Sequence, residues 1–138
     1  MSAMVKVSVI IPVYNVAPYL GECLDSVLQQ TLKDIEIVCV DDCSTDNSSF
    51  LLKKYAESDI RIRLFYNERN RDLSFTRNRG LKESCGEYVF FLDSDDALYD
   101  NEVLKELYTI AEQDDAELVS GRTVNWFPDE SGKEYVVN

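Results

Sequence analysis

The chain has 138 residues, of which 45% are hydrophobic and 11% aromatic, enough for one packed domain. Acidic residues outnumber basic ones by 26 to 14, and the resulting net charge of −12 repels nucleic acid and anionic lipid headgroups. A general polyanion-binding protein is therefore excluded. A sugar nucleotide would need a cation to mediate its contact with such a chain; acidity that serves solubility alone is the other interpretation.

Histidine is absent and the four cysteines form no CxxC pair, which excludes a zinc site and a Ser-His or Cys-His dyad. Reduced, mostly buried cysteines are expected, at Cys23, Cys39, Cys43 and Cys85. Neither a signal peptide nor an apolar stretch of transmembrane length is present. We expect a cytoplasmic protein, either free or peripheral at the inner membrane face.

Strand-like and helix-like segments alternate along the chain. Strands are predicted, in order, over Val5–Val13, Ile35–Val40, Ile60–Tyr66, Tyr88–Leu92 and Ala116–Trp126. Helices are predicted between them, over about 18–28, 48–55, 75–84 and 101–113, the last capped by Asp100 or Asn101. A turn at Asp129–Gly132 and the segment Glu134–Val137 suggest a final hairpin. This order predicts an α/β fold with an open, mostly parallel sheet and helices on both faces.

In such sheets ligands bind beyond the carboxyl ends of the strands, which here carry Pro12–Asn15, Asp41–Asp46 and Asp93–Asp96. The first strand is not followed by GxGxxG, and GxxxxGK[ST] does not occur, so neither a Rossmann dinucleotide site nor a P-loop is indicated. A phosphate group bound there would be neutralised in another way.

Asp93 and Asp95 offer that way, because side chains two apart in an extended chain project to the same face. Neighbouring carboxylates raise each other's pKa unless a cation lies beside them. Mn²⁺ or Mg²⁺ suits the pair, since Mg²⁺ takes one or two carboxylates and completes its shell with water and phosphate oxygens. The alternative is that Asp93–Asp96 caps the following helix and is solvated.

Taken together, the segments VSVIIPVYN, VDDCSTD, TRNRGL and GEYVFFLDSDD resemble family 2 of the glycosyltransferases, which has the GT-A fold. The resemblance runs from about Val5 to Asp100. It implies metal-dependent transfer of a sugar from a nucleoside diphosphate sugar, with UDP the expected nucleotide, to a glycan or lipid-linked acceptor. It also implies inversion at the anomeric carbon and a role in bacterial polysaccharide biosynthesis.

The resemblance implies roles at the nucleobase end of the site. Tyr14 would lie against the base, with backbone groups of Pro12 and Val13 beside it; a core tyrosine is the alternative. Asp42 corresponds to the acid that accepts a hydrogen bond from uracil, and Asp41 is expected to be structural.

Further roles fall near the phosphates. Asp93 would hold the ribose hydroxyls and share the metal with Asp95, while Ser94 and Asp96 would contact the donor. Arg77 would contact the donor or the acidic loops, or else form a purely structural ion pair. Gly80, inside a predicted helix, indicates close backbone packing.

Departures from the family pattern limit these expectations. Cys43 replaces a glycine, and Arg69–Asp72 forms a basic loop suited either to phosphate or to solvent. The family's general base lies well after the DxD motif, so the catalytic base is expected beyond Asn138. We therefore divide the chain into a nucleotide-sugar-binding part, 1–115, and an incomplete acceptor-side part, 116–138, whose sheet edge would favour self-association.

Two functions remain open, and two others are disfavoured. A glycosyltransferase domain is the first interpretation, and a donor-binding fragment without turnover is the second. A nucleotidyltransferase would show a glycine-rich basic loop after the first strand, where PVYNVAPYLGE stands instead. A receiver domain would cluster its acids after the first strand, which here ends in Pro-Val-Tyr-Asn.

Overall fold

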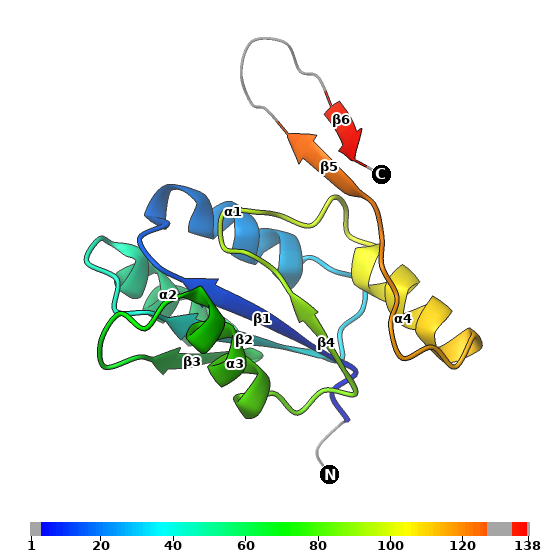
Figure 1. Ribbon diagram of the computed structural model, residues 1–138, viewed down its shortest axis with the longest axis horizontal. Coiled ribbons are helices and arrows are strands. Elements are labelled where there is room, and N and C mark those ends of the chain that lie inside the picture. Colours follow the sequence, from blue (N-terminus) through cyan, green and yellow to red (C-terminus); the bar gives the residue numbers. More distant parts are fainter. Residues whose placement is uncertain (1–3, 127–133, 138) are drawn as a thin grey trace.

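The computed structural model describes residues 4–126 and 134–137, and its centre is a parallel four-stranded sheet (Figure 1). The strands lie in the order β3-β2-β1-β4, with β2 and β1 as the two central strands. The elements are β1 (Val7–Val13), α1 (Ala17–Leu28), β2 (Ile35–Asp41), α2 (Ser48–Ser58), β3 (Ile62–Tyr66), α3 (Leu73–Glu83), β4 (Tyr88–Phe91), α4 (Val103–Gln113), β5 (Thr123–Trp126) and β6 (Glu134–Val137). This arrangement confirms the predicted α/β fold class.

The sheet is covered on both faces, as the apolar runs of β1 and β2 require. On one face, β1 side chains such as Val9 and Ile11 pack in the main core with α1. On the other, α3 lies against Ile10 and Val40, and Gly80 permits the approach because a Cβ there would come within 2.4 Å of Ile10 Cγ2. The close packing predicted from this glycine is confirmed.

The last predicted strand is shorter than expected, because the structure begins β5 at Thr123 and leaves 116–122 irregular. β5 pairs antiparallel with β6 in a separate two-stranded sheet. The predicted turn Asp129–Gly132 lies outside the described residues. Helix α4 also begins later than predicted, after Glu102, so neither Asp100 nor Asn101 is its N-cap; the Asp100 carboxylate instead accepts the Glu102 N–H.

The cysteines divide evenly between core and surface. Cys23 and Cys39 are buried, Cys43 and Cys85 are exposed, and all of them are free thiols. The expectation of mostly buried cysteines is wrong for two of them. In the described part of the chain, the helices are too short or too polar to cross a membrane.

A buried carboxylate ties the strands together at the amino end of the sheet. Glu36 accepts hydrogen bonds from the Ser8 hydroxyl at 2.6 Å, the Cys85 N–H at 2.7 Å and Arg63 Nη1 at 3.0 Å. The Ser8 hydroxyl in turn accepts the Gly86 N–H at 2.8 Å. Burial alone would raise the pKa of Glu36, but these hydrogen bonds outweigh it and hold that pKa below its usual value of 4.5. We call this group the amino-end network.

Candidate functional site

A pocket of about 430 Å³ opens at the carboxyl end of the sheet, where the topology predicts a ligand site. Loops after β1, β2, β3 and β4 and the start of α3 form its walls. The lining residues are Pro12, Val13, Tyr14, Val16, Asp42, Asn70, Asp72, Leu73, Thr76, Asp93, Ser94 and Asp95. The pocket therefore gathers most of the residues that the sequence proposes for substrate and metal.

The acids after β4 lie in a turn rather than in an extended strand end. β4 stops at Phe91, and the Asp96 N–H donates to the Asp93 carbonyl at 3.0 Å. Carboxylate oxygens of Asp93, Asp95 and Asp96 consequently lie within 4.8 Å of one another. Strand alternation was the wrong reason for expecting Asp93 and Asp95 to converge, and the turn adds Asp96 to them. Because α4 begins only at Val103, the acids do not cap that helix.

The three acids, which we call the acid cluster, are only partly compensated within the protein. Arg77 Nη2 lies 2.6 Å from Asp93 Oδ1, so this arginine reaches an acid of the cluster. Burial first, and then the negative charges of Asp95 and Asp93, raise the pKa of Asp96. Cys23, whose thiol donates to the Asp93 carbonyl, is affected too: burial and the cluster's charge raise its pKa to about 12. The cluster thus concentrates negative charge beyond what one arginine neutralises.

This donor set fits a hard divalent cation. Carboxylate oxygens are the ligands that Mg²⁺ and Mn²⁺ prefer, and three of them converge here without nitrogen or sulfur donors. Asp93 shares one oxygen with Arg77, which leaves Asp95 and Asp96 as the exposed carboxylates of the cluster. Burial and then the repulsion from Asp95 and Asp93 raise the pKa of Asp96, and a cation would relieve the repulsive part.

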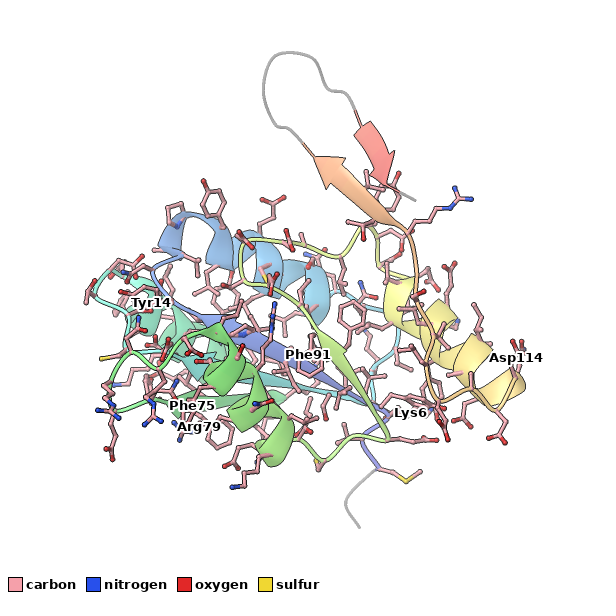
Figure 2. All side chains as sticks on the ribbon, viewed as in Figure 1. Lys6, Tyr14, Phe75, Arg79, Phe91 and Asp114 are labelled. Atoms are coloured by element: carbon pink, nitrogen blue, oxygen red, sulfur yellow. The ribbon has the colours of Figure 1, made fainter. Side chains whose placement is uncertain are left out.

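Tyr14 also lines the pocket and lies on the loop that follows β1. Its side chain is 46% exposed, which excludes the core tyrosine that the sequence left open (Figure 2). Pro12 and Val13 are buried in β1, and the Val13 carbonyl accepts the Asp42 N–H at 2.8 Å. That carbonyl is therefore already hydrogen-bonded within the chain. Of Pro12, Val13 and Tyr14, only Tyr14 has an exposed side chain.

Asp42 lines the pocket, but its carboxylate also holds a loop in place. Asp42 Oδ1 accepts hydrogen bonds from Asn67 Nδ2 at 2.9 Å and the Arg71 N–H at 2.7 Å, and Oδ2 accepts the Asp72 N–H at 3.1 Å. This folds 67–72 against the pocket, where Asp72 accepts the Phe75 N–H and caps α3. The sequence did not predict this structural role; contact with a base stays a prediction. Asp41 is structural as expected, since it accepts the Ser44 N–H and the Ser49 hydroxyl.

Sequence reasoning missed Asn15, which joins the loops after β1 and β2. Its side-chain oxygen accepts the N–H groups of Thr45 at 2.8 Å and Asp46 at 3.2 Å, and its own N–H donates to the Ser44 hydroxyl at 3.1 Å. Asn15 has a φ of 50°, which asparagine tolerates better than most residues. An asparagine directly after the strand-end tyrosine was the available signal.

Comparison with known proteins places this site in a family. The family model for Glycosyl transferase family 2 matches residues 8–137. Glycosyltransferase GlyG of Streptococcus pneumoniae is 38% identical over 120 residues, which cover 87% of this chain and 40% of GlyG.

Solved structures agree. S. aureus TarS in complex with UDP-GlcNAc superposes with a TM-score of 0.73 at 36% identity, covering 78% of this chain and 31% of that one. The mannosyltransferase PcManGT from Pyrobaculum calidifontis, in complex with GDP-Man and Mn²⁺, gives 0.72 at 28% identity, covering 80% and 33%. The chain thus spans less than half of each of these proteins.

Proposed function

Because the chain belongs to glycosyltransferase family 2, we propose that it supplies the donor-binding part of an enzyme that transfers a sugar from a UDP-sugar, with a divalent metal. The observation that carries the proposal is that one pocket is lined by the exposed aromatic side chain of Tyr14 and by two acids of the acid cluster, Asp93 and Asp95. The UDP-GlcNAc complex of TarS and the Mn²⁺ complex of PcManGT support this choice of donor and cofactor. Transfer of a hexosyl or N-acetylhexosaminyl group to a glycan or lipid-linked acceptor is part of the proposal.

The pocket suggests how its residues would divide the donor. Tyr14 would stack on the base, beside Pro12 and Val13, because an exposed aromatic face offers planar apolar contact. The Asp42 carboxylate would accept a hydrogen bond from the base through Oδ2. This oxygen already accepts one N–H from the chain, whereas Oδ1 accepts two. This end of the pocket would select the nucleotide.

The acid cluster would handle the phosphate end. Asp95 and Asp93 would hold Mn²⁺ or Mg²⁺, and the bound cation would supply charge neutralisation of the diphosphate. Asp93 would also hold ribose hydroxyls, and Ser94 and Asp96 would contact the donor. Arg77 is anchored on Asp93 at 2.6 Å, while its Nε is buried without a hydrogen-bond partner among the described residues. We assign Arg77 the orientation of Asp93 and contact with the donor.

A donor-binding chain without turnover is the second candidate. Of the described acids, those lining the pocket are Asp93 and Asp95, which the proposal uses for the donor, and Asp42 and Asp72, which hold a loop and cap α3. We therefore name no general base in this chain and propose that residues beyond Asn138 provide it. Inversion, a peripheral position at the inner membrane face, self-association, and the division between 1–115 and 116–138 belong to the same proposal.

Isothermal titration calorimetry of UDP, with GDP as the comparison and with or without Mn²⁺, tests the donor site. We expect UDP binding that needs Mn²⁺ and is at least about tenfold weaker in Asp95→Ala, because a metal ligand is lost. Asp114→Ala is the matched control, since this exposed acid lies at the end of α4, far from Tyr14 (Figure 2). Equal UDP binding with and without Mn²⁺ by the folded chain would refute the metal-dependent site.

A further inference from the structure

The negative charge of the chain is unevenly distributed. Residues 61–82 hold seven of the 14 basic residues and two of the 26 acids, a local charge of +5 in a chain of net charge −12. These residues form β3, the loop after it and most of α3. The exclusion of anionic partners drawn from the net charge therefore does not apply to this side of the molecule.

Arginines and aromatic rings alternate across this side. The Arg71 guanidinium lies 4.1 Å from the centre of the Phe75 ring, and Arg79 follows Phe75 one helical turn later. Arg79 and Arg63 lie over the ring of Phe65, at 5.8 and 5.3 Å. Figure 2 shows Phe75 and Arg79 together beside α3 and away from Lys6 and Asp114. We call Arg63, Phe65, Arg69, Arg71, Phe75, Arg79 and Lys82, with Tyr66, the basic–aromatic surface.

Part of the charge of this surface is available to a partner. Arg63 is occupied by Glu36, and Arg79 donates to the Tyr66 carbonyl and to Asn67. Within residues 4–124, Arg69, Arg71 and Lys82 are exposed and form no ion pair with a carboxylate.

Two exposed aromatic rings accompany these cations. Phe75 is 39% exposed and Tyr66 is 44% exposed. Exposed cations beside exposed aromatic rings are the combination that binds the headgroup region of an anionic bilayer.

The surface adjoins the candidate donor pocket at one end and lies away from the acid cluster at the other. Asn70, Asp72 and Leu73 line the pocket, so the loop before α3 contributes to both. The sheet order places β3 at one edge and β4, which precedes the acid cluster, at the other. The cluster would repel an anionic partner placed over it, which favours contact through β3 and the outer face of α3.

We propose that the basic–aromatic surface docks the protein on a membrane containing anionic phospholipid, with Arg69, Arg71 and Lys82 at the headgroups and Phe75 at the interface. The inference does not depend on the proposed sugar transfer. A soluble polyanion would use the cations without needing exposed rings such as Phe75, which is why we favour a lipid surface.

Flotation of the 138-residue chain with vesicles of phosphatidylglycerol and phosphatidylcholine tests the proposal, with pure phosphatidylcholine as the comparison. We expect binding only to the anionic vesicles, weakened roughly a hundredfold by replacing Arg69, Arg71 and Lys82 with serine, since each cation contributes at a charged surface. Replacing Lys33, Lys53 and Lys54 with serine gives a control of equal net charge, because these exposed lysines lie outside the surface. We expect this control to change binding less than about threefold.

A second variant, Phe75→Ala, separates membrane docking from attraction of charge. We expect roughly tenfold weaker vesicle binding, because the ring at the interface is lost while all charges remain. Absence of vesicle binding by the native chain, equal loss in the two triple variants, or vesicle binding that Phe75→Ala leaves unchanged would each overturn the proposal. Urea unfolding of every variant shows that the fold is retained.

Discussion

The two ends of the sheet treat carboxylates in opposite ways. At the amino end, Glu36 is buried and accepts three hydrogen bonds, and its pKa is lowered. At the carboxyl end, three acids lie close together, one arginine pairs with Asp93, and the pKa of Asp96 is raised. The first end satisfies its charge within the protein, which stabilises the fold. The second leaves charge uncompensated, which is the condition of a site waiting for a ligand.

The largest effect on stability should come from disrupting the amino-end network. Glu36→Gln removes the charge that Arg63 pairs with, and we expect a loss of about 2 kcal/mol of unfolding free energy at neutral pH. That figure is below the usual cost of breaking a buried pair, because the Arg63 side chain is 39% exposed. Urea unfolding measures the loss. Asp95→Asn is the matched change at the other end, and a similar loss there would remove the distinction between the two ends.

The pH dependence of stability should follow the same division. A group whose pKa is lower when folded stabilises the fold above its unfolded value and loses that contribution as the pH falls through the folded value. For Glu36 the loss should begin near its usual 4.5 and deepen below it. Urea unfolding across this range should therefore show the native chain approaching Glu36→Gln. A difference in unfolding free energy between the native chain and Glu36→Gln that is constant with pH would mean that the charge of Glu36 contributes nothing to stability.

Adding a divalent cation should stabilise the folded chain by binding to the acid cluster at the carboxyl end of the sheet. At ten times its dissociation constant, Mn²⁺ should add about 1.4 kcal/mol to the unfolding free energy, which raises Tm by about 5 °C. Thermal unfolding should show this increment in the native chain and in Glu36→Gln alike, because the two ends act independently. The increment should vanish in Asp95→Asn. An unchanged increment in Asp95→Asn would place the bound cation elsewhere.

The smallest effect concerns Asp96 alone. Burial and the charges of Asp95 and Asp93 raise its pKa in the folded chain, so protonation removes both costs, and stability should rise slightly as the pH falls through the folded value toward the usual 3.8. Asp96→Asn should imitate this at neutral pH with a gain of a few tenths of a kcal/mol, since solvent screens an exposed acid. Urea unfolding at low salt measures the gain, and Glu106→Gln on α4 is the control. A loss of stability in Asp96→Asn would show that this acid is structurally engaged.

The sequence predicted the sheet because its central strands carry continuous apolar runs that belong in a parallel sheet. Gly80 was informative for a similar reason, since a helical glycine indicates what packs against it. The last strand was harder to predict. The residues after Ala116 are mixed in polarity, and of the predicted segment only Thr123–Trp126 forms a strand. A segment that pairs outside the main sheet lacks the burial that makes a strand recognisable.

Less of the site could be predicted, because it depends on loops brought together from distant parts of the chain. The motif indicated Asp93 and Asp95, but the turn that adds Asp96 is a property of the backbone. The role of Asp42 in folding 67–72 joins residues 25 to 30 positions apart. Glu36 gave a signal that was not used, since a glutamate inside an apolar strand requires buried partners.

The cysteines make the two ends of the sheet chemically addressable. Cys43 is exposed in the loop after β2, and Cys85 is exposed just before β4, so a pair of thiol-reactive dyes would span the sheet from one end to the other. Cys23 and Cys39 would stay unlabelled in the folded chain, because burial raises the pKa of both thiols. Burial and Glu36 also raise the pKa of Cys85, so a higher pH would speed its labelling. The native sequence thus provides two labelling sites for a distance measurement across the sheet. One lies on the loop that Asn15 binds, and the other lies beside the amino-end network.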